Sequence, residues 1–236
     1  HVSGKHASGS DLFYRQVNEG EYSFEWDIVG HLGWLVPCEL DITPIDHHGQ
    51  QALLVCMNDI SERRLHENKI RRLVFNDSLT GLFNRYALLQ RMKPVLEQLP
   101  EGERFALLYI NLDRFRAIND TFGHATGDAV LIHCARQIKS VIRGSALVAR
   151  IGGEEFVVLL PGCDLDAAAV VGNRLRRTVA AFLQYEKHPV TVSVGVSACH
   201  GGDDTAQALF ERADRALYAA KAAGRNCLRV ESPQAA

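Results

Sequence analysis

Two adjacent carboxylates, Glu154 and Glu155, follow two glycines in the middle of an apolar stretch. Apolar runs at 147–149 and 157–161 flank the motif, and two such runs around a glycine turn predict a β-hairpin. Tight hairpin turns favour Asn or Asp beside Gly, so turn geometry does not explain the glutamates. Two acids on a rigid turn can hold a hard cation such as Mg²⁺, which in turn binds phosphates. The spacing alone fits a solvated acidic hairpin equally well.

Four further motifs accompany this hairpin. They are 77–85 (DSLTGLFNR), 111–120 (NLDRFRAIND), 123–128 (GHATGD) and 216–226 (ALYAAKAAGRN). In this order, and together with Gly-Gly-Glu-Glu-Phe at 152–156, they resemble the GGDEF family of diguanylate cyclases over residues 75–231. One such motif would be weak support, whereas five in the same order are specific.

The resemblance implies an enzyme that condenses two GTP molecules into cyclic di-GMP and pyrophosphate, with Mg²⁺ or Mn²⁺ as cofactor. Such a reaction requires positioned groups and neutralised charge rather than covalent work by the protein. Each domain would hold one GTP, so two domains would face each other in a homodimer. The implied fold is α/β, the ferredoxin-like palm that adenylyl cyclases and polymerases share.

The resemblance also assigns roles to individual residues. It implies metal binding by Asn111, Leu112 and Glu154, and catalysis by Glu154 and Glu155. For the triphosphate it implies two cations and the backbone of a turn, namely Lys221, Arg225, Asp113, Arg114, Phe115 and Arg116. We expect the two cations to point the same way, because they stand four residues apart at the end of a predicted helix.

Asn119 and Asp128 match the positions with which the family reads guanine. A carboxylate that accepts from the N1–H and N2–H₂ groups, beside an amide, distinguishes guanine from adenine. Each residue also has an ordinary structural interpretation. Asn119-Asp120 could be a turn or a helix cap, and Asp128 an acid in the first turn of a helix.

Asn111 departs from the family, which usually has a metal-binding Asp there. Asn keeps a carbonyl oxygen but loses a charge, so we expect weaker Mg²⁺ binding. Asp113 lies two residues further on and would point the same way along a strand, unless the turn redirects it. A rival hypothesis is therefore a non-catalytic GTP-binding or interaction module.

A second departure concerns regulation. Many family members carry an Arg-x-x-Asp site for product inhibition just before the hairpin. The matching stretch here runs from Arg143 to Ala146, so the Arg is kept and the Asp is missing. We expect this form of product inhibition to be absent.

Composition narrows the class of protein. The net charge is −2 and the pI is about 6.6, which argues against nucleic acid or an anionic membrane as a partner. The six cysteines are scattered without a CxxC pair, which predicts free thiols in a reducing cytoplasm. No apolar run reaches the length of a membrane span, and no signal peptide is visible. We expect a cytoplasmic bacterial signalling protein without direct membrane contact.

Three segments are expected along the chain. An antiparallel sheet is predicted by alternating apolar residues at 22–30 and 32–42 and by the apolar run at 53–57. The segment that follows, Asn58–Arg64, resembles the end of a PAS sensor domain. Residues 1–60 would thus be a partial PAS domain. The mostly polar stretch 61–76 predicts a linker helix, either a dimerising signalling helix or a solvated one. Residues 77–231, with alternating helix and strand patterns, would be the cyclase domain.

Overall fold

The computed structural model describes residues 22–30, 33–97, 103–142, 144–182, 184–185, 188–200 and 204–232. The chain divides into two compact units between Arg71 and Arg72. The first holds a three-stranded sheet and the second a five-stranded sheet. The division falls inside helix α2, Ser61–Phe75, whereas the sequence boundaries at 60/61 and 76/77 stay predictions.

The first unit is an antiparallel sheet in the order β1–β2–β3. Its strands are β1 (Tyr22–Val29), β2 (Leu35–His47) and β3 (Gln50–Asp59), which confirms the predicted antiparallel arrangement. Two arginines at the start of α2, Arg63 and Arg64, form ion pairs with Glu25 of β1 at 2.6 and 2.7 Å. No residue of α2 is buried, so this helix has a solvated surface on all sides.

The second unit is built on a five-stranded sheet in the order β10–β9–β4–β6–β5. Its strands are β4 (Arg104–Leu112), β5 (Leu147–Gly152), β6 (Glu155–Pro161), β9 (Val192–His200) and β10 (Leu228–Glu231). All neighbours are antiparallel except β10 and β9. This is the α/β ferredoxin-like palm that the sequence predicts, with β10 added at one edge.

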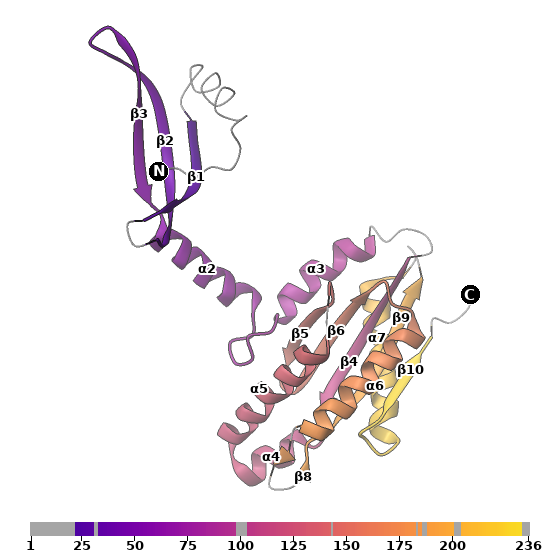
Figure 1. Ribbon diagram of the computed structural model, residues 1–236. Coiled ribbons are helices and arrows are strands. Elements are labelled where there is room, and N and C mark those ends of the chain that lie inside the picture. The colour runs from indigo at the N-terminus through magenta and orange to yellow at the C-terminus, as the bar shows by residue number, and fades with distance from the viewer. Residues whose placement is uncertain are drawn as a thin grey trace. The chain divides into compact units, whose positions relative to one another are not determined.

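Helices cover both faces of this sheet (Figure 1). Helices α5 (His124–Val141) and α6 (Leu165–Phe182) pack on one face, and α3 (Arg85–Glu97) and α7 (Ala206–Ala222) pack on the other. The central strand β4 therefore sends Leu108 and Ile110 into the first layer and Leu107 into the second. Burial on both faces explains why the run 105–112 is apolar without alternation.

Three elements were not expected from the sequence. Helix α4 (Phe115–Phe122) stands where we expected only a turn, and the short strands β7 (Gln184–Tyr185) and β8 (His188–Pro189) follow α6. The apolar residues of α4, at 115, 118 and 122, do follow helical spacing, but eight residues are fewer than the window over which such a period is usually judged. Its position is fixed instead by Phe115, which is buried in the core on the side of α5. Across the described residues, no helix is both long and apolar enough to cross a membrane.

Candidate active site

The two-glycine hairpin lies at the end of the central strand. β5 and β6 pair antiparallel, and the turn between them contains Gly153, whose φ of +39° is a left-handed value that glycine tolerates well. The backbone N–H of Leu112 donates to the carbonyl of Glu154 at 3.2 Å. In the β4–β6 register Asn111 stands opposite Glu155. The fold thus brings Asn111, Leu112, Glu154 and Glu155 together at the end of the sheet where β4 stops and β6 begins.

This end of the sheet offers oxygen ligands that suit Mg²⁺ or Mn²⁺. Glu154 supplies a carboxylate, Asn111 an amide oxygen, and Leu112 its backbone carbonyl, because its side chain is packed in the core. Asn111 is only 4% exposed, so little water competes for its side chain. Within the described parts of the chain, no three acid, His or Cys side chains gather into a ready metal site. A metal here would therefore need oxygen atoms from a bound phosphate group as well.

Hydrogen bonds from Arg150 hold the hairpin turn in place. Its Nε donates to the carbonyl of Gly153 at 2.8 Å, and its Nη1 donates to both carboxylate oxygens of Asp77 at 3.0 Å. The hydroxyl and backbone N–H of Thr80 also donate to Asp77, at 2.6 and 2.8 Å. The 77–85 motif therefore fixes the acidic turn, a role that the sequence analysis did not identify.

We expect Asp77→Asn to destabilise the second unit at neutral pH by about 2 kcal/mol, the scale of hydrogen bonds to a charged group. Burial by itself raises the pKa of Asp77, but hydrogen bonds from Thr80 and the Arg150 guanidinium outweigh it and hold the pKa below its usual range. Because the folded-state pKa is lowered, this stabilisation is present above the ordinary Asp pKa and is lost as pH falls through the folded value.

Urea unfolding followed by circular dichroism at several pH values measures this effect. The difference between wild type and Asp77→Asn should shrink below about pH 4, where the unfolded carboxyl protonates. Glu103→Gln, which neutralises an exposed carboxylate, is the control and should leave stability unchanged. A pH-independent difference for Asp77→Asn would contradict the proposed role of its charge.

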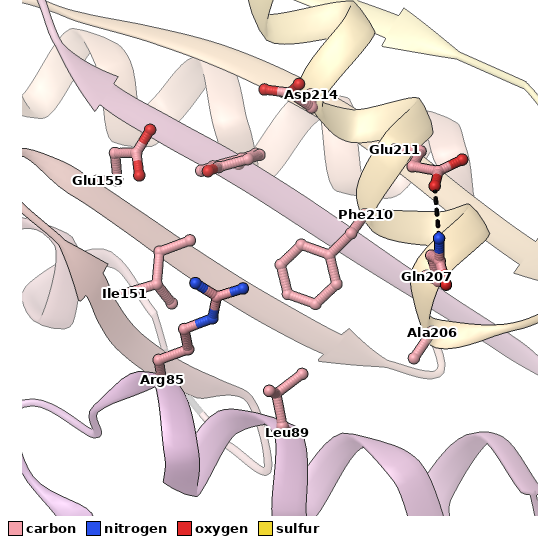
Figure 2. A pocket seen from close by; sticks show the side chains of 10 residues that line it. Arg85, Leu89, Ile151, Glu155, Ala206, Gln207, Phe210, Glu211 and Asp214 are labelled. Carbon is pink, nitrogen blue, oxygen red and sulfur yellow. Dashed lines mark hydrogen bonds between the residues drawn. The ribbon is translucent and has the colours of Figure 1, made fainter.

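A cavity of about 520 Å³ lies beside Glu155, between α3, α7 and the sheet. Figure 2 shows Arg85 of α3 pointing into it between Ile151 and Phe210, with Glu155 and Asp214 on its rim. Tyr109 of β4 also lines it. Burial raises the pKa of Tyr109 well above its usual range, and the nearby Glu155 and Asp214 carboxylates raise it further. Tyr109 therefore stays protonated and keeps a donor close to Glu155.

The start of α4 presents backbone N–H groups. Arg114 has a φ of 56°, a left-handed value, and the helix begins at the next residue. The first N–H groups of a helix have no partner within it and can bind anions. Phe115 offers only its backbone because its side chain is buried, whereas Arg116 is exposed and pairs with Asp120 at 3.6 Å. The phosphate-binding roles of these residues stay predictions.

Lys221 and Arg225 do not lie on the same helix, so the prediction that helical spacing points them the same way is wrong. Helix α7 ends at Ala222, so Arg225 lies beyond it and the four-residue helical spacing does not apply. Gly224, Arg225 and Asn226 have φ values of 107°, 66° and 43°. The direction of Arg225 is therefore set by a left-handed turn after the helix.

The candidate guanine-reading residues lie together at the α4–α5 junction. Asn119 packs so closely on Gly127 that a Cβ at position 127 would stand 1.9 Å from Asn119 Oδ1. This explains the glycine directly before Asp128. The Oδ1 atom is buried and has no hydrogen-bond partner among the described residues, while Asp128 is exposed on α5. A buried acceptor without a donor is costly, and this atom has no exposed surface, so a base could pair with it only if the amide turned outward.

Asp113 does not share the surroundings of Asn111. It is 7% exposed, and its carboxylate accepts hydrogen bonds from Thr191 and Ser193 at 2.7 and 2.6 Å. The stretch 143–146, where the family's Arg-x-x-Asp site would lie, is covered only in part, because Arg143 lies outside the described residues, so the absence of product inhibition stays a prediction.

A ferredoxin-like palm with an acidic hairpin at the end of its central strand defines the class of nucleotidyl cyclase domains. The family model described as "Diguanylate cyclase, GGDEF domain" matches residues 74–227. The chain therefore belongs to the GGDEF domain family, as its motifs predict.

Named relatives support this assignment. Diguanylate cyclase DgcM of Escherichia coli is 40% identical over 184 residues, which cover 78% of this chain and 45% of that protein. Diguanylate cyclase DgcP of Pseudomonas aeruginosa is 39% identical over 188 residues, or 76% of this chain and 28% of that protein. The chain thus spans less than half the length of these curated relatives.

Solved structures share the fold. The coiled coil and GGDEF domain of DgcB from Caulobacter crescentus, in complex with c-di-GMP, superimposes with a TM-score of 0.66 at 30% identity, covering 74% of this chain and 93% of that one. The active GGEEF domain of a diguanylate cyclase from Vibrio cholerae gives a TM-score of 0.52 at 32% identity, covering 61% and 88%. That domain has the same Glu-Glu variant of the motif.

Proposed function

We propose that this protein is a diguanylate cyclase that condenses two GTP molecules into cyclic di-GMP and pyrophosphate. The observation that carries the proposal is the Leu112–Glu154 hydrogen bond, which joins the acidic turn to the end of β4 beside Asn111. Glu154, Asn111 and Leu112 would hold Mg²⁺ or Mn²⁺, which would neutralise charge on the phosphates. Lys221, Arg225 and the first turn of α4 would bind the triphosphate, and Glu155 would face the reacting 3′-hydroxyl.

The active form would be a homodimer. Cyclic di-GMP contains two phosphodiester bonds, and each forms when the 3′-hydroxyl of one GTP attacks the α-phosphate of the other. One domain holds one GTP, so a second copy must present the second nucleotide. The first unit would be the end of a PAS sensor domain, with α2 as the helix that links it to the cyclase in a bacterial cytoplasmic signalling protein.

Asn111 favours one rival, a GTP-binding module with little or no turnover. Both functions predict binding of GTP, so binding does not separate them. Incubation of the purified protein with GTP and Mg²⁺, followed by chromatography of the nucleotides, does. One cyclic di-GMP formed for every two pyrophosphates supports the cyclase. GTP binding without product at any Mg²⁺ or Mn²⁺ concentration supports the rival.

We expect the protein to bind GTP at least about tenfold more tightly than ATP, because groups that pair with one base edge are left unpaired by another base. Asp128→Ala should reduce this preference, since it removes the acceptor for the guanine N1–H and N2–H₂ groups. Calorimetric titration with both nucleotides measures it. Asp166→Ala, which removes another exposed acid near the start of a helix, is the matched control. Equal affinities for GTP and ATP in the wild type would rule out this assignment.

A further inference from the structure

The carboxylate of Asp113 joins three segments that are distant in the sequence. It accepts hydrogen bonds from Ser193 Oγ at 2.6 Å, near the start of β9, and from Thr191 Oγ1 at 2.7 Å, in the residue directly before β9. It also accepts one from the backbone N–H of Asn226 at 2.9 Å, in the turn after α7. Its own N–H donates to the carbonyl of Thr191 at 2.9 Å. Both carboxylate oxygens are thus used by the protein itself.

The turn that Asp113 holds has an unusual backbone. Arg225 and Asn226 both have left-handed φ values, which Asn tolerates well but which a residue such as Arg rarely adopts. Asn226 is held from two sides: Asp113 binds its N–H, and Arg176 Nη1 of α6 donates to its carbonyl at 3.0 Å and its Oδ1 at 2.7 Å. The N–H of Arg225 donates to the carbonyl of Ala220 at 3.2 Å.

The fixed turn determines where Arg225 lies. Arg225 stands directly between the end of α7 and the doubly held Asn226, so its backbone has little freedom. It lines a cavity of about 530 Å³ together with Arg114, the residue before α4. Arg114 at the start of α4 and Arg225 from the far end of the chain therefore line the same cavity. Asp113 is connected to both segments, because it directly precedes Arg114 and accepts a hydrogen bond from Asn226, the residue after Arg225.

We propose that Asp113 is a positioning residue for triphosphate binding, which holds the 224–226 turn so that Arg225 faces the start of α4. It does not replace Asn111 as a metal ligand, because three protein donors already occupy its oxygen atoms. The inference rests on the proposed binding of GTP. It goes beyond it by giving Asp113 a role through Arg225 rather than by contact with the substrate.

The test compares the affinities of GTP and GMP, which share guanine but differ in the phosphates beyond the first. Asp113→Asn should weaken GTP binding about tenfold and leave GMP binding unchanged, at low and high Mg²⁺ alike. A double-variant cycle with Arg225→Ala then asks whether the two residues act together. Asp113→Asn should add little to the loss already caused by Arg225→Ala.

Several results would overturn this inference. The affinity of Asp113→Asn for GTP could be unchanged, or GTP and GMP could lose affinity equally. The losses of affinity could add in the double variant, or high Mg²⁺ could restore the affinity, as it would for a metal ligand. If Asp113→Asn does not fold, Arg176→Met loosens Asn226 from the other side and should give the same pattern. Wild-type protein that binds GTP but forms no product contradicts the cyclase proposal alone.

Discussion

Replacing Glu154 with alanine is expected to abolish the formation of cyclic di-GMP. Glu154 is the acidic residue of the turn whose backbone carbonyl accepts from Leu112 N–H, so the backbone that carries its carboxylate is held at the end of β4. Removing one such preorganised charge-stabilising group lowers turnover by about 10²–10³-fold, or roughly 3–4 kcal/mol of transition-state stabilisation. The initial rate of product formation from GTP, measured by chromatography, checks this.

Two variants make the result specific. Glu154→Gln keeps the shape of the side chain but loses its charge, so it should be nearly as inactive while remaining folded. Glu97→Ala removes an exposed glutamate of α3 that lies outside the site and should retain full activity. If Glu154→Ala turned over at the wild-type rate, the hairpin would not be the catalytic centre.

The Asn111→Asp variant is expected to gain activity, and the gain should be larger at low Mg²⁺ than at high Mg²⁺. Asn111 is buried and stands opposite Glu155 in the β4–β6 pair. A carboxylate there adds a charged oxygen to a site that otherwise depends on a neutral amide. Wild type should be slow, with a rate that rises with metal concentration because GTP supplies the remaining oxygen ligands.

Thermal unfolding provides a readout that does not depend on turnover. Like charges opposite each other on adjacent strands repel, so Asn111→Asp should be less stable than wild type without metal. Added Mg²⁺ or Mn²⁺ should stabilise the variant more than the wild type. If rate and stability are the same in both proteins at every metal concentration, position 111 does not bind metal here.

Much of the fold could be read from local patterns. The mostly apolar run at 105–112 is typical of a buried strand, and β4 lies in the centre of the sheet with helices on both faces. The glycines at 152 and 153 predicted the hairpin between β5 and β6. Helix α4 was missed although Phe115, Ile118 and Phe122 follow helical spacing, because the segment is short and its motif was interpreted as a phosphate-binding turn.

The candidate site was predictable as a set of residues, but its geometry was not. Motif order identified Asn111, Glu154 and Asn119, whereas the burial of Asn119 Oδ1 against Gly127 depends on how α4 packs on α5. The contribution of Asp77 and Arg150 also could not be foreseen. They lie 73 positions apart and meet only because the chain folds back on β5.

Motifs and residue types are local properties, so the family, the chemistry of the available side chains and the Asn at position 111 can be read from the sequence. Which of those side chains are free for a ligand depends on how the chain folds. Asp113 looked like a spare metal ligand, yet it is bonded to residues 78, 80 and 113 positions further along the chain. Lys221 and Arg225 looked like neighbours on a helix, yet a left-handed turn separates them. Hydrogen bonds between distant segments set both outcomes, and their partners become neighbours only when the chain folds.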